Sequence, residues 1–182
     1  MSELFSIQLQ NRQQQGRDGV WLDLPTTTEQ VQAALRQIGI SSDNPQGLFI
    51  SGYFAEEEKR FAIPYNMVLA SNMDELNFLA SRLETLSTGE RAELNAALQA
   101  PQSELFSIGR ITDFPENVDY YVHLPDVHGP AQLGDYYLNR SGMVDMPEEW
   151  KGGIDTAQFG RYVAQQEQGV FTEYGYLVKS GD

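Results

Sequence analysis

The sequence predicts an α+β fold with a small α+β unit, a helical middle and a mixed last third. Stretches with alternating apolar and polar residues, typical of half-buried strands, occur towards both ends of the chain. Between them lie segments whose apolar residues recur every three or four positions, as on one face of a helix. We therefore expect a small α+β domain over residues 1–62, a helical domain over 63–101, and a C-terminal α+β domain over 102–182.

The first domain is predicted to contain a small sheet and one helix. Residues 4–10 alternate between apolar and polar side chains, and 20–24 and 48–54 have the composition of two further strands. Thr26 and Glu29 have the spacing of a capping box and predict the start of the helix. The apolar stripe of this helix would consist of Val31, Ala34, Leu35 and Ile38, and Gly39 would end it.

The central domain is predicted to be a helical bundle. Asn72 can cap a helix that begins at Met73, and Phe78 lies nearly opposite the apolar stripe, which predicts a helix packed on two sides. Ser87 and Glu90 form a capping box for a second helix, which Pro101 would end. The stripe of the first helix consists of Leu76, Leu79, Ala80, Leu83 and Leu86.

The last third is predicted to mix short strands with helices. We expect a strand over 118–124, a helix around 131–139, a helix opened by Asp155, and a final strand over 170–178. The hexapeptide SELFSI occurs both at 2–7 and at 103–108. Its flanks differ, so we expect a strand in the first copy, and in the second a helical segment with Ser103 as a candidate cap, rather than a duplicated domain.

The net charge of the sequence restricts the possible classes of function more than its motifs do. The 182 residues include 26 acidic and 12 basic side chains, for a net charge of −14, and the acids are distributed along the chain. Direct nucleic-acid binding is disfavoured because phosphates need a basic footprint. The acidity favours a partner with a basic surface, although it could also serve solubility alone. No apolar run approaches the ~20 residues that span a bilayer, and no signal peptide is evident, so we expect a cytoplasmic protein.

Sequence motifs for catalysis or cofactor binding are lacking. The chain has no cysteine and no GxGxxG, P-loop or GxSxG pattern, so we expect no cofactor. Both histidines lie in a short stretch, where His123, Asp126 and His128 could form a loop metal site of a small hydrolase. Pro125 and Gly129 interrupt any helix there. The metal-dependent hydrolase is therefore kept only as an alternative.

Four blocks of the sequence, in order, resemble the ArdA-type antirestriction proteins. They are VWLDLP, DELNFLASRLETLS, NVDYYVHLPDV with LGDYYL, and FGRYVAQQEQGVFTEYGYLV. The resemblance implies a non-enzymatic protein of mobile genetic elements, with an elongated chain of three small domains in series and a homodimer formed end to end through the C-terminal part. It also implies an acidic mimic of double-stranded DNA that occupies the DNA-binding groove of type I restriction-modification enzymes.

This resemblance assigns expected roles to two sets of residues. An alternative function that would also depend on DNA mimicry is regulation of another DNA-binding protein or nuclease. The tyrosines at a dimer interface would be Tyr120, Tyr121, Tyr136 and Tyr137. The acids that contact the partner would be Glu56, Glu57, Glu58, Asp74, Glu75, Glu84, Asp126, Asp135, Glu148 and Glu149.

Overall fold

The protein has the predicted α+β fold. The computed structural model describes residues 3–14, 16, 18–101, 103–117 and 120–180. Within these residues it contains eight α-helices and two three-stranded antiparallel sheets. The chain forms two compact units, one of residues 1–86 with 105–113 and the other of 87–104 with 114–182. The finer division into three domains and the elongated arrangement stay predictions.

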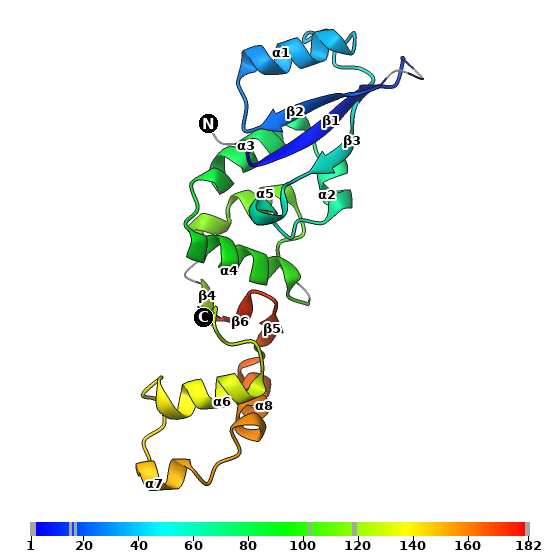
Figure 1. Ribbon diagram of the computed structural model, residues 1–182. Helices are drawn as coiled ribbons and strands as arrows, with labels where there is room; N and C mark the ends of the chain where they lie inside the picture. The colour runs from blue at the N-terminus through cyan, green and yellow to red at the C-terminus, as the bar shows by residue number, and fades with distance from the viewer. Residues whose placement is uncertain (1–2, 15, 17, 102, 118–119, 181–182) are drawn as a thin grey trace. The chain divides into compact units, whose positions relative to one another are not determined.

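The sheet of the first unit has β1 as its central strand (Figure 1). Its strands are β1 (Phe5–Asn11), β2 (Val20–Leu24) and β3 (Leu48–Phe54), in the order β2-β1-β3. Alternate residues of β1 are buried, because successive side chains of a strand point to opposite faces of a sheet. The three strands predicted for this region are therefore confirmed.

Helix α1 (Thr28–Gln37) begins one residue later than the predicted capping box. Thr27 is the N-cap, and it exchanges capping hydrogen bonds with Gln30. Thr26 is held elsewhere, since its backbone N–H donates to Asn77 Oδ1 over 2.8 Å and its carbonyl accepts from Asn77 Nδ2 over 3.1 Å. The pairing of Thr26 with Glu29 was thus wrong because a contact 51 residues away fixes the backbone of Thr26.

Helix α3 (Met73–Glu84) is packed on one side only. Asn72 is its N-cap as predicted, and its predicted apolar stripe is buried. Phe78, however, has 61% of its surface exposed, so the prediction that this helix packs on two sides was wrong. The buried side of α3 faces the other elements of its own unit, including α5 (Ile108–Thr112) and β2, while α2 (Tyr65–Leu69) packs on β3.

The second copy of SELFSI does not form a strand. In the first copy, Phe5, Ser6 and Ile7 lie in β1, whereas in the second Ile108 begins α5. The cap of α5 is Ser107, whose hydroxyl accepts from the backbone N–H of Arg110, and not Ser103 as predicted. The short 3₁₀ turns η1 (Glu57–Lys59) and η2 (Phe114–Glu116) also lie among the described residues.

The second unit pairs its sheet with helix α4 (Thr88–Gln99), which has the predicted capping box of Ser87 and Glu90. The sheet has the order β4-β6-β5. The predicted final strand is in fact a hairpin, because Gly175 adopts a φ of +113° and turns the chain. The strands are β4 (Tyr121–Leu124), β5 (Val170–Thr172) and β6 (Gly175–Lys179); Val118 and Asp119 of the predicted strand lie outside the described residues.

Two helices of the second unit cross at glycines. Helix α6 (Pro130–Asn139) packs on α8 (Thr156–Glu167), whose predicted N-cap Asp155 is confirmed. A Cβ on Gly134 would lie 1.9 Å from the Thr156 carbonyl oxygen, and one on Gly160 would lie 1.8 Å from that of Pro130. Only glycine therefore permits this approach. The connection between the two helices carries the short α7 (Glu148–Lys151) (Figure 1).

Candidate functional site

The candidate acids of the first unit lie mainly on its surface. Glu56, Glu57 and Glu58 are exposed at η1, and Lys59 pairs with Glu56 over 3.2 Å. Helix α3 carries three more. Asp74 and Glu75 are exposed in its first turn, where the positive end of the helix dipole favours carboxylates, and Glu84 is partly buried at its C-terminal end.

The candidate acids of the second unit occupy a loop and two helices. Asp126 is exposed in the connection from β4 to α6, and Glu148 and Glu149 are exposed in the first turn of α7. Asp135 of α6 accepts from Asn139 Nδ2 over 2.8 Å and from Arg140 Nη2 over 3.0 Å. The bond from Asn139 is the main cause of the lowered pKa of Asp135, so this carboxylate stays ionised in the folded state.

Some of the candidate acids form ion pairs within the protein, and others do not. Glu56, Asp135 and Glu148 pair with Lys59, Arg140 and Lys151, the last over 2.6 Å. Exposed pairs of this kind contribute little stability but do offset local charge. In the part of the chain that the structure describes, six candidates form no ion pair and leave their charge available to a partner: Glu57, Glu58, Asp74, Glu75, Asp126 and Glu149.

The two histidines do not share a site with Asp126. His123 lies on β4, and its Nε2 is 2.6 Å from the backbone carbonyl oxygen of Tyr174. His128 is exposed in the following loop, and its backbone N–H donates to Gln132. Among the described residues, no three His, Asp or Glu side chains are grouped so that they could hold a metal ion. The loop arrangement considered from the sequence is therefore not formed.

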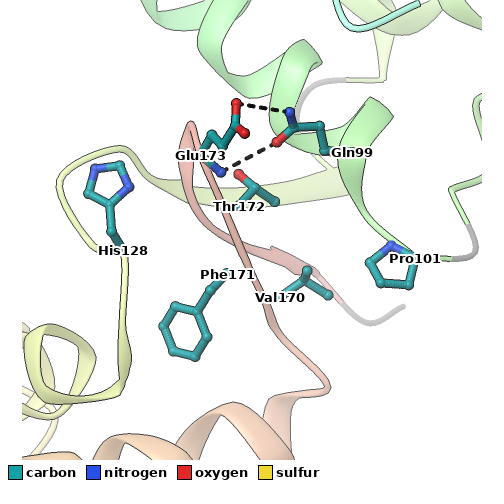
Figure 2. Close-up of a pocket in the computed structure, with 7 residues that line it drawn as sticks. All are labelled: Gln99, Pro101, His128, Val170, Phe171, Thr172 and Glu173. Atoms are coloured by element: carbon teal, nitrogen blue, oxygen red, sulfur yellow. Dashed lines mark hydrogen bonds between the residues drawn. The ribbon is translucent and has the colours of Figure 1, made fainter. Parts of the chain in front are cut away.

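His128 instead lines a depression of about 650 Å³ at the hairpin of the second unit (Figure 2). Val170, Phe171 and Pro101 supply apolar walls. The Gln99 side chain donates to the Glu173 carboxylate and accepts from the Glu173 backbone N–H, each over 3.3 Å. These polar groups bond to each other, so the contact anchors the hairpin tip to the end of α4.

The candidate tyrosines have different environments. Tyr120 is half exposed, and Tyr121 packs on Phe114 with 5.7 Å between ring centroids. Tyr136 and Tyr137 make an edge contact at 5.5 Å on α6. Burial is the main cause of a raised pKa at Tyr121 and Tyr137.

Sequence reasoning missed Glu167, which accepts hydrogen bonds from two tyrosines. The Tyr137 hydroxyl donates to one carboxylate oxygen, and the Tyr176 hydroxyl donates to the other over 2.9 Å. Burial, followed by the bond to Glu167, raises the pKa of Tyr137 and Tyr176 well above the ordinary range. The spacing of these residues gave no signal, because they lie on α6, α8 and β6 and meet only in the fold.

These features define an acidic α+β protein of two compact units, with carboxylates exposed on both. Residues 15–178 match the family model described as Antirestriction protein (ArdA). The chain belongs to the ArdA family and is an antirestriction protein, which implies an interaction with restriction enzymes. The resemblance found in the sequence blocks is thereby confirmed.

A search among curated proteins found no match. Within the described ranges, no helix has both the length and the apolar character needed to cross a membrane.

Proposed function

We propose that the protein blocks restriction by mimicking double-stranded DNA and occupying the DNA-binding groove of type I restriction-modification enzymes. The observation that carries this proposal is the set of exposed carboxylates without ion pairs, which occurs on both compact units. The protein's net charge of −14 opposes direct binding to nucleic acid. A groove that binds DNA is lined by cations, and those cations attract carboxylates as they attract phosphates.

Many weak contacts would supply the affinity. Exposed charge pairs contribute about 0–1 kcal/mol each, so no single carboxylate is expected to dominate. Counterions leave both surfaces when they meet, as they do when a protein binds DNA. The affinity for the enzyme should therefore fall steeply as salt rises.

We also propose that the protein acts as a homodimer formed through its C-terminal part. Support comes from β4, which is an edge strand of its sheet. Two exposed apolar side chains lie at this edge, Tyr120 at 50% and Val122 at 48% exposure. An edge strand with exposed apolar residues is a common site of pairing between chains.

Competition with DNA tests the proposed function. Purified protein is added at low salt to a type I methyltransferase core bound to labelled duplex DNA, and displacement of the duplex is followed by anisotropy. We expect stoichiometric displacement that weakens as salt rises. An unrelated protein of similar net charge serves as the control. If the antirestriction protein displaces no more DNA than this control, the proposed target is wrong.

A further inference from the structure

Three of the acidic segments also expose a large aromatic side chain. Phe54 precedes Glu56–Glu58 and has 57% of its surface exposed. Phe78 on α3 has 61%, and Trp150 on α7 has 65%. Single exposed apolar residues are common on protein surfaces. Here they occur beside three separate groups of candidate acids.

The local geometry brings ring and carboxylate to the same surface. On α3, Phe78 follows Asp74 by four residues and Glu75 by three, so the three side chains share one face of the helix. On α7, Trp150 follows Glu149 by one residue and Glu148 by two. Met143, in the same connection between α6 and α8, has 76% of its surface exposed. The exposed face of α3 is therefore both acidic and apolar, and Phe54 and Trp150 lie within a few residues of candidate acids.

A surface that imitated only phosphates would need no exposed rings. DNA itself presents apolar parts between its phosphates, namely the carbon atoms of the deoxyribose rings and the thymine methyl group. Proteins that bind DNA accordingly combine cations for the phosphates with apolar or polar groups for the sugar and the bases. A partner built for DNA therefore has apolar positions between its basic side chains.

We propose that Phe54, Phe78 and Trp150 are apolar anchors, which occupy positions of the partner that take sugar rings or thymine methyl groups when DNA is bound. The partner is a protein with a cationic DNA-binding surface, which the flanking carboxylates complement in charge. This inference rests on the proposed function and adds to it a contribution to affinity that does not depend on salt. Carboxylates set the salt dependence of binding, and the anchors set the affinity that remains at high salt.

The two contributions can be separated by measuring Kd over a salt series. The variants are Phe78→Gln and Trp150→Gln, because glutamine favours helices and both side chains are exposed. Each variant should weaken binding to the methyltransferase core about 10-fold at every salt concentration. The slope of log Kd against log salt should not change. The double change Asp74→Asn with Glu75→Gln should instead reduce that slope.

Phe106 provides a matched control. Its side chain is 66% exposed, but the Arg110 guanidinium lies 4.5 Å from its ring centroid and covers one face. Phe106→Gln should leave both Kd and slope unchanged. Light scattering of each variant shows whether the ring serves a contact between copies of the chain instead.

Two outcomes would overturn the inference, and a third would overturn the proposed function on which it rests. Binding of Phe78→Gln and Trp150→Gln equal to that of Phe106→Gln would show that the rings contribute nothing. A variant that weakens binding only by becoming monomeric would show that a second copy covers the ring. Failure of the unchanged protein to bind the core at any salt would instead remove the proposed function itself.

Discussion

Glu167 links three elements of the second unit, because its carboxylate accepts hydrogen bonds from tyrosines of two other elements. Hydrogen bonds to a charged group contribute roughly 1.5–3 kcal/mol. We expect Glu167→Ala to lower the free energy of unfolding by about that amount, since two hydroxyls lose their acceptor. Urea unfolding followed by circular dichroism measures this. Glu149→Ala, at an exposed carboxylate of α7, should leave the midpoint unchanged.

The same contact predicts a loss of stability in alkali. The pKa values of Tyr137 and Tyr176 are raised in the folded state, mainly by burial. Unfolded tyrosine ionises near pH 10, so the stabilising contribution is complete below about pH 10 and is lost as the pH rises towards the folded pKa values. We expect the free energy of unfolding to decline above about pH 10. Tyr137→Phe should make this decline shallower, and an unchanged decline in that variant would contradict the assignment.

Substitution of His128 distinguishes the proposed inhibitor from the alternative of a metal-dependent hydrolase. Its side chain is exposed and lines only the open depression at the hairpin. We expect His128→Gln to inhibit restriction as well as the parent does, in an assay of plasmid cleavage by a type I enzyme. Loss of inhibition in a variant that keeps the parental melting temperature would indicate a specific role for the imidazole.

At the scale of elements, the crossing of α6 and α8 gives the sharpest prediction. A methyl group at Gly160 would overlap the Pro130 carbonyl, so the helices must separate. Overpacking of this kind costs typically 1–3 kcal/mol, and we expect Gly160→Ala to lower the free energy of unfolding by at least that much. Gly89→Ala on α4 is the control, because nothing lies within 4 Å of its added Cβ. That change should be neutral or slightly stabilising. Equal melting temperatures for the two variants would contradict the close crossing.

Elements set by neighbouring residues were predictable from the sequence. The caps Asn72, Ser87 and Asp155 each bond to a backbone N–H three residues ahead, so their signal lies within one turn. The buried stripe of α3 also follows from helical spacing alone. Local chemistry therefore sufficed for the starts of α3, α4 and α8 and for the strands of the first sheet.

The predictions were wrong where a contact with a residue distant in the sequence determines the local structure. Thr26 is bonded to Asn77, which moves the cap of α1 to Thr27. The apolar run at 170–178 looks continuous, but Gly175 approaches the Leu124 carbonyl and turns the chain into a hairpin. The exposure of Phe78 likewise reflects which elements pack on α3, and no periodicity contains that information.

For the whole molecule, the sequence identifies the candidate acids but not their ion pairs. The three pairs form with basic residues close by on the surface, and side-chain conformation decides whether they close. We expect any single neutralisation of an unpaired acid to change the Kd for the methyltransferase core by less than about 5-fold. Neutralising all six together should weaken binding severely and reduce the slope with salt. A single change that abolishes binding without unfolding would point to a discrete site.

The predicted elongation can be measured directly. A single compact domain of this length would have a radius of gyration of about 16 Å. We expect a clearly larger value for the protein in solution, because mimicry of a duplex requires charge spread along an axis. Small-angle scattering gives the value, and a compact monomer would contradict both the elongated arrangement and the mimicry that depends on it.

Each compact unit is assembled from two separate stretches of the chain, and this has a consequence for synthesis on the ribosome. The first unit is complete only when residues 105–113 have left the ribosome. Helix α4 can pack on its sheet only after β6, at Gly175–Lys179, has been synthesised. At roughly 5–20 residues per second, α4 remains without its sheet for about 4–15 s. Chains that stop early would expose Leu94, Ala96 and Ala97 to chaperones and proteases. Relatives could therefore not exchange halves at the junction after Leu86, since the C-terminal half would carry away residues 105–113, which the first unit requires.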